Sequence, residues 1–71
     1  MTDDSDHLKK LSVMLPYWIE HNAEHAQEFR KWADGAGSAA RSLEQAAGLL
    51  EQANLSLSSA LESVYAASAG E

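Results

Sequence analysis

The sequence predicts an all-α protein folded as an antiparallel helical hairpin, and three observations lead to this prediction. A glycine-rich break, "DGAGS" at 34–38, divides the chain near its middle. On both sides of the break, apolar residues recur every three or four positions, the period of one helix face. Only five residues separate the two arms, and connections this short place consecutive helices antiparallel. We therefore expect a single domain over residues 1–71 with its turn at 34–38.

The first arm is predicted to be helical over about residues 6–34. At about 100° per residue, a stripe of side chains falls within about 60° of Leu11. Its members are Met14, Leu15, Trp18, Asn22, His25, Phe29, Trp32 and Ala33. Pro16 lies inside this pattern and lacks a backbone N–H, so we expect the helix to kink or restart there. The favoured division is a short segment at about 6–14 and a long one at about 16–34.

The second arm is predicted to be helical over about residues 38–66, with a frayed tail at 67–71. Three rows of residues recur in it every seven positions, which is the repeat of a coiled-coil seam. The rows are Leu43, Leu50, Leu57 and Val64; Ala39, Ala46, Ala53 and Ala60; and Ala40, Ala47, Asn54 and Leu61. Leu49 and Leu55 lie off these rows and predict a second contact surface.

Self-association is the next expectation. Hydrophobic residues make up 45% of the chain, but aromatics only 7%, so a lone hairpin has little bulk to bury. Two helices alone enclose no core. We expect a homodimeric four-helix bundle or a larger oligomer.

Charge and composition exclude several classes of partner. The net charge of −6 disfavours both nucleic acid and anionic membrane surfaces. The absence of cysteine excludes disulfides and thiolate chemistry. No apolar run approaches the ~20 residues of a membrane span, and no cleavable signal pattern is recognisable. The expected location is the cytoplasm.

The stretch "PYWIEHNAEH", Pro16–His25, concentrates the side chains suited to metal chemistry. His21 and His25 lie one helical turn apart on one side of the predicted helix, with Glu24 and Glu28 close by. Imidazoles and carboxylates at this spacing bind divalent transition metals such as nickel, cobalt or zinc. One chain supplies two imidazoles, so a complete site is expected to draw a second pair from a symmetry mate.

A structural interpretation of the same residues stays open beside the metal site. Polar residues on a helix seam fix register and oligomer state, a role that suits Asn22, Asn54 and a buried His25. In this interpretation the remaining large side chains are core or interface residues of a non-enzymatic assembly or adaptor module. These are Trp18, Phe29, Trp32, Leu43, Leu50 and Leu57.

Two enzyme motifs are weaker alternatives. "HNAEH" matches the H-x-x-E-H pattern of zinc peptidases, but a 71-residue hairpin has no room for a peptide cleft. Ferritin-like carboxylate sites use Glu-x-x-His, whereas this chain has the reverse order, His21-x-x-Glu24 and His25-x-x-Glu28. An oligomeric ferroxidase is therefore off-pattern, and we expect the protein not to be an enzyme.

The segment "LPYWIEHNAEHAQEFRKWAD", 15–34, resembles one found in small uncharacterised prokaryotic helical-hairpin proteins. Their segment reads roughly Leu-Pro-His-Trp-Ile-Glu-His-Asn-x-x-His-Ala, followed by an aromatic residue and a Trp-Ala pair. The matching positions are Pro16, Trp18, Glu20, His21, Asn22, His25, Phe29 and Trp32. The resemblance implies nickel or cobalt handling and a metal-handling protein as partner. Tyr17 departs from the pattern, where those proteins often carry a further His. If that His is a ligand in them, the site here is one ligand short, or Tyr17 substitutes for it weakly.

Overall fold

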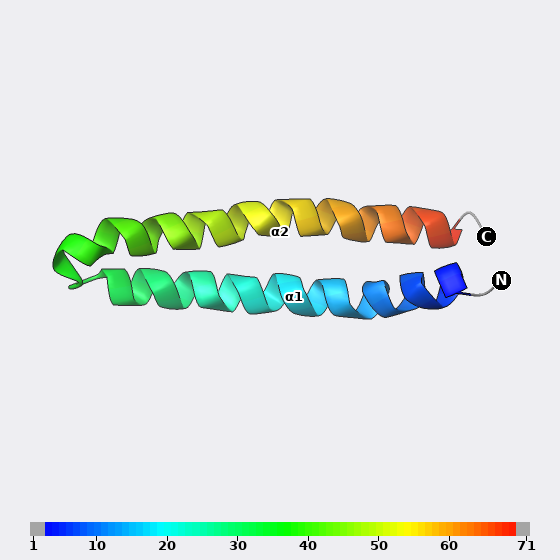
Figure 1. The fold of residues 1–71 in the computed structure, drawn as a ribbon, viewed down its shortest axis with the longest axis horizontal. Helices are drawn as coiled ribbons and strands as arrows, with labels where there is room; N and C mark the ends of the chain where they lie inside the picture. Colours follow the sequence, from blue (N-terminus) through cyan, green and yellow to red (C-terminus); the bar gives the residue numbers. More distant parts are fainter. Residues whose placement is uncertain (1–2, 70–71) are drawn as a thin grey trace.

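The computed structural model describes residues 3–69 as two long helices packed side by side. Helix α1 spans Asp3–Ala33 and helix α2 spans Ala40–Ala69, and a short 3-10 turn, Gly37–Ala39 (η1), precedes α2. The helices run antiparallel, so the start of α1 and the end of α2 lie together at the end of the molecule away from the turn (Figure 1). The molecule measures 54 × 14 × 14 Å. The predicted all-α hairpin is confirmed.

The turn forms where the two glycines were expected to form it. Gly35 and Gly37 have φ of 88° and 61°, a left-handed conformation that costs other residues energy because of their Cβ atom. The Asp34 N–H donates to the Arg30 carbonyl at 3.3 Å, and the Ala36 N–H donates to the Ala33 carbonyl at 3.0 Å. These bonds satisfy carbonyls at the end of α1 and complete the reversal.

The two helices meet along one heptad seam, which we call the inner seam. On α1 its residues are Leu8, Ser12, Leu15, Ile19, Asn22, Ala26, Phe29 and Ala33. On α2 they are Ala40, Leu43, Ala47, Leu50, Asn54, Leu57, Leu61 and Val64. All are buried or half-buried, and their alternating spacing of three and four residues is typical of a coiled coil. Among the residues whose burial the structure describes, 5–68, three of the five buried hydrophobic ones are alanines, so this core is thin.

The α2 rows were predicted with mixed success. The Leu43 row and the Asn54 row form the inner seam, as expected. The alanine row is wrong as a core row, because Ala39, Ala53 and Ala60 are exposed. These alanines lie on one flank of the seam, about 90° from its centre, where they do not meet α1.

The stripe predicted on α1 was rotated from the true seam. Ile19 and Ala26 face α2, whereas Trp18 is 39% exposed and Trp32 is 68% exposed. The two tryptophans are therefore not core residues of this chain. The reason is that α1 carries two neighbouring apolar seams, and a single hydrophobic average falls between them.

The interruption expected at Pro16 is absent, since α1 continues through it. Proline removes one helical hydrogen bond, to the carbonyl of Ser12, but Pro16 is exposed, so its ring lies outside the contact between the helices. Packing along both sides of the proline outweighs its local cost of about 3 kcal/mol.

The end of α2 is also more ordered than expected, since the helix runs to Ala69 rather than ending near residue 66. Val64 is buried, and a hollow lined by Ser5, Leu8, Lys9 and Ser68 lies where the two helix ends meet. The N-terminal part of α1 starts early enough to support this last stretch of α2. Residues 70–71 of the predicted tail lie outside the described residues.

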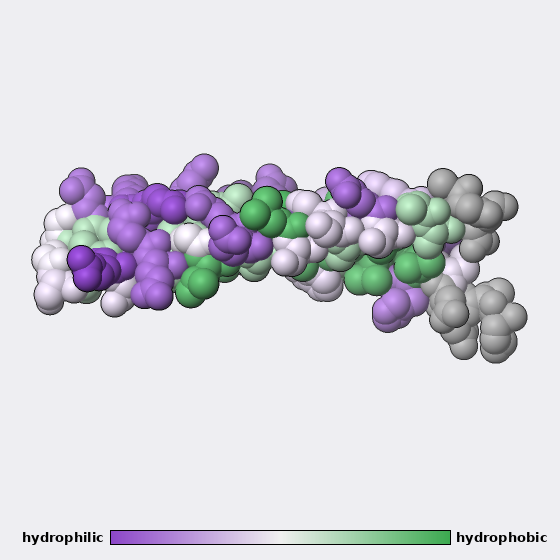
Figure 2. All heavy atoms as spheres, turned by 90° about the horizontal axis from the view of Figure 1, so that it is seen from above, coloured by the Kyte–Doolittle hydropathy of each residue, from purple (hydrophilic) through white to green (hydrophobic). Residues whose placement is uncertain are grey.

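Polar character is uneven along α2. Seen from the α2 side, strongly hydrophilic residues gather over the half next to the turn, and the other half is paler with hydrophobic patches (Figure 2). Leu49, Leu55 and Tyr65 are 62%, 65% and 54% exposed. Within residues 3–69, neither helix has the length and apolarity needed to cross a membrane.

Candidate metal site

A second heptad seam runs along α1 beside the inner seam, and we call it the outer seam. Its residues are Leu11, Met14, Trp18, His21, His25, Glu28 and Trp32. Their spacing again alternates between three and four residues, so they form one continuous face of the helix. This face includes the pair His21 and His25 and both tryptophans of the chain. Most of its side chains are exposed.

The two histidines of the outer seam turn toward each other. The Nε2 atoms of His21 and His25 are 3.1 Å apart, and their rings meet edge to face with centroids 4.5 Å apart. Two nitrogens that each bind one metal ion at about 2.1 Å lie about 3.0 Å apart when the N–metal–N angle is a right angle. They lie about 3.4 Å apart when that angle is tetrahedral. The two Nε2 atoms are within hydrogen-bond distance of each other, and this separation is also close to that of two adjacent ligands on one ion.

Neighbouring side chains hold the imidazoles in this orientation. Tyr17 stacks on His21 at 5.6 Å between centroids, and Phe29 stacks on His25 at 6.0 Å. A Glu28 carboxylate oxygen lies 3.6 Å from Nδ1 of His25. This distance is just beyond that of a hydrogen bond, so the carboxylate lies beside Nδ1 without fixing the tautomer of the ring.

The four predicted ligands therefore differ in position. His21 and His25 come together, and Glu28 lies behind His25 rather than beside the two Nε2 atoms. Glu24 is exposed on the next face of α1. Within residues 3–69, no three His, Asp or Glu side chains gather as a complete metal cluster. One chain thus presents a two-nitrogen half-site.

Asn22 and Asn54 link the helices beneath this half-site. The Asn22 side-chain amide donates to Oδ1 of Asn54 at 3.1 Å, and the Asn54 amide donates to the Ile19 carbonyl at 2.9 Å. The predicted role of this pair in register agrees with these bonds. Asn22 opposite Asn54 brings His25 level with Glu51, whereas a turn centred at residue 36 would bring His21 level with it.

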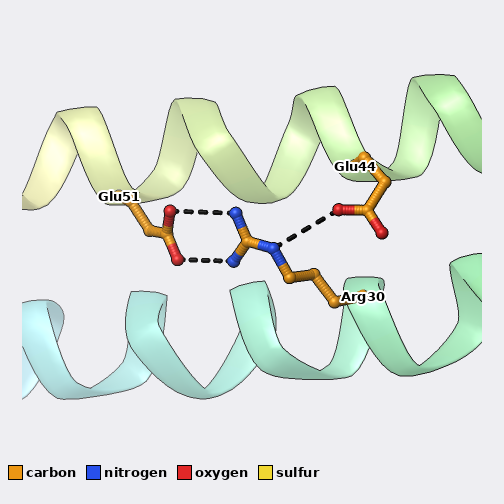
Figure 3. Close-up of polar contacts among 3 residues, drawn as sticks. All are labelled: Arg30, Glu44 and Glu51. Carbon is orange, nitrogen blue, oxygen red and sulfur yellow. Dashed lines mark hydrogen bonds and ion pairs between the residues drawn. The ribbon is translucent and has the colours of Figure 1, made fainter.

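The opposite flank of the hairpin carries an ion cluster that sequence reasoning missed. The Arg30 guanidinium crosses from α1 and donates to both carboxylate oxygens of Glu51, with Nη2 at 2.9 Å from Oε1 (Figure 3). Its Nε lies 3.4 Å from a Glu44 oxygen. Along α1 itself, Asp34 is the acidic residue one helical turn after Arg30, so spacing within the helix points to that residue rather than to α2. A basic residue flanking one seam and two acidic residues seven apart flanking the other were the available signal.

This cluster shifts the protonation equilibria of its members. The hydrogen bonds from Arg30 hold the pKa of the Glu51 carboxyl below its ordinary value of 4.5. The same bonds raise the pKa of Arg30. The cluster is exposed, so it adds orientation more than stability.

The fold and site define a class: a two-helix hairpin with one flank closed by ions and one aromatic flank bearing a histidine pair. Within that class the chain belongs to the family described as a domain of unknown function, DUF8180, whose sequence profile matches residues 11–64. The match includes the whole outer seam and the two asparagines that bond across the helices, Asn22 and Asn54, which we call the register pair. No curated protein and no solved structure is detectably similar to the chain.

Proposed function

We propose that this protein is a small, non-enzymatic metal-binding protein that holds a divalent transition metal ion through Nε2 of His21 and His25. The observation that carries the proposal is their 3.1 Å separation, with Glu28 behind Nδ1 of His25. Nitrogen-only ligation suits nickel, cobalt and zinc.

The exposure of the site favours a carrier or accessory role over a structural one. The His25 side chain is 44% exposed and Glu28 is 59% exposed, so an ion there exchanges with the surroundings. Structural metal sites are instead shielded from solvent by the surrounding protein. The receiving partner would be a metal-handling protein that takes the ion from this exposed site.

Calorimetric titration of tag-free protein with Ni(II), Co(II) and Zn(II) tests this proposal. We expect wild type to bind at least one of them more tightly than about 10⁻⁴ M, the level of a loose two-ligand contact. His21→Ala/His25→Ala abolishes this binding, whereas His7→Ala, a histidine remote from the pair, leaves it unchanged. Affinity no tighter than about 10⁻⁴ M for all three ions contradicts the proposal.

The same titration separates the two glutamates. Glu28→Gln weakens binding by about tenfold, because it removes the carboxylate beside Nδ1 of His25. Glu24→Gln is the matched control and leaves the affinity unchanged. The reverse ranking would make Glu24 the ligand and Glu28 a bystander.

An assembly or adaptor module is the second candidate, favoured by the Asn22–Asn54 bond and by the exposed Trp18 and Trp32. Here His21 and His25 serve helix pairing alone. It predicts that the double histidine variant loses helicity or its oligomeric state in metal-free buffer. Circular dichroism and light scattering on the variants made for titration distinguish the two functions.

A further inference from the structure

The outer seam is exposed, and the hairpin as a whole has more accessible surface than a compact protein of the same mass. The hairpin has 5365 Å² of accessible surface, whereas a compact protein of its 7.7 kDa mass exposes about 4,300 Å². The excess, about 1,000 Å², is close to the ~800 Å² that each partner buries in a standard interface. Met14, Trp18 and Trp32 are 38%, 39% and 68% exposed along this seam.

We propose that a second copy of this chain docks on the outer seam, antiparallel, with a two-fold axis passing between His21 and His25. The metal part of this proposal rests on the proposed function, and the docking part does not. Four imidazoles, two from each copy, would then surround one ion.

The spacing of the outer seam fits this symmetry. From Met14 to Trp32 the intervals read four, three, four, three, four, which is the same in both directions. A two-fold axis at residue 23 therefore places every one of these residues opposite another member of the seam. A symmetric dimer requires such a self-complementary patch.

The pairs created by that axis are chemically compatible. Met14 meets Trp32 of the second copy, a thioether–aromatic contact. Trp18 meets Glu28 of the second copy, where the indole N–H has a carboxylate to donate to. His21 meets His25. Glu28 is the seam's only Asp, Glu, Lys or Arg in a chain of net charge −6, so this face repels its own copy least.

The incomplete ligand set explains why the partner is a second copy. Each chain offers two nitrogens, and within residues 3–69 no third ligand joins them. A symmetric partner supplies the other two without any further binding motif, giving the four ligands common in metal sites. The α2 flank on the same side carries small residues such as Ala46 and Ala53, so it does not hold the second α1 away.

Light scattering and titration on tag-free protein test the shared site. We expect dimers with one Ni(II) per two chains. Trp32→Ala, two helical turns from His25, raises the dimer dissociation constant at least tenfold and weakens nickel binding, although both histidines remain. Tyr65→Ala, which truncates an exposed aromatic side chain on α2, changes neither. One Ni(II) per monomeric chain, unaffected by Trp32→Ala, overturns the inference while the proposed function stands.

Spin-label distances test the geometry without metal, and the absence of native cysteine makes single-cysteine labelling direct. With 1.5 Å rise per residue, labels at position 27 lie about 12 Å apart along the axis and labels at position 10 about 39 Å apart. We expect Lys10→Cys to give much the longer distance and Gln27→Cys the shorter. Equal distances overturn the inference, since they indicate an axis along the hairpin. The expected distances without any nickel binding support the docking and remove the proposed function.

Discussion

The two flanks of the hairpin differ in where their side chains find partners. On the Arg30 flank, contacts cross from one helix to the other, because the guanidinium binds carboxylates of Glu44 and Glu51 on α2. The two histidines of the outer seam instead contact rings of their own helix, since His21 stacks on Tyr17 and His25 on Phe29. One flank fastens the hairpin, and the other presents ordered groups outward.

This difference shows how a chain with a thin core separates stability from binding. Ion pairs and asparagine hydrogen bonds connect the two helices and set their register. The residues of the outer seam take no part in these bonds. The imidazoles are oriented by their own helix, so small movements between α1 and α2 do not disturb them. Variants of the shared core, the register pair and the ion flank should therefore have graded and separable effects.

The largest effect is expected from Leu15→Ala on the inner seam, on which both flanks depend. Leu15 is 3% exposed, and truncating a buried leucine lowers the free energy of unfolding by about 2–5 kcal/mol. Leu55→Ala is the matched control, since Leu55 is 65% exposed and its loss changes stability by less than about 0.5 kcal/mol. Urea titrations followed by circular dichroism measure both. Equal urea midpoints for the two variants would contradict the placement of Leu15 in the core between the helices.

A smaller loss is expected from the register pair. Asn54→Ala removes its bonds to Asn22 and to the Ile19 carbonyl, and lowers the free energy of unfolding by about 1–2 kcal/mol. A double-mutant cycle with Asn22→Ala should give a coupling energy of about 0.5 kcal/mol or more. Strict additivity of the two single variants would show that the side-chain bond contributes nothing.

The smallest effect on stability is expected from a change in the cluster of Arg30, Glu44 and Glu51, which we call the ion flank. This effect depends on pH and salt. Because the pKa of Glu51 is lowered in the folded hairpin, its ionised form stabilises the fold above pH 4.5. That contribution is lost as the pH falls through the lowered pKa. Glu51→Gln should therefore melt slightly below wild type at pH 7, and the gap should close on acidification.

Two further measurements sharpen the contrast between the flanks. About 0.5 M NaCl should remove most of the difference in melting temperature between wild type and Glu51→Gln at pH 7, because salt screens exposed ion pairs. Nickel affinity of Glu51→Gln should equal that of wild type, whereas Glu28→Gln on the outer seam loses affinity with little change in melting. A fall in nickel affinity for both variants would mean that the flanks are coupled.

The heptad repeats made the hairpin and the α2 seam predictable from sequence, and the two glycines made the turn predictable. The histidine pair was equally visible, because residues four apart on a helix share a side whatever that helix packs against. The α1 seam was not predictable in the same way. Trp18 and Trp32 increase the hydrophobicity of one side without facing α2, so the amphipathic average pointed between two seams.

What the sequence determined by itself is local: helix period, turn chemistry and the spacing of His21 and His25. Only the tertiary structure decided what lies between the helices, because register depends on how the turn and the side chains of both arms fit together. The bonds of Asn22 to Asn54 and of Arg30 to Glu51 are consequences of that register. The placement of Glu28 behind His25 rests on side-chain rotamers, which residue spacing permits but does not select.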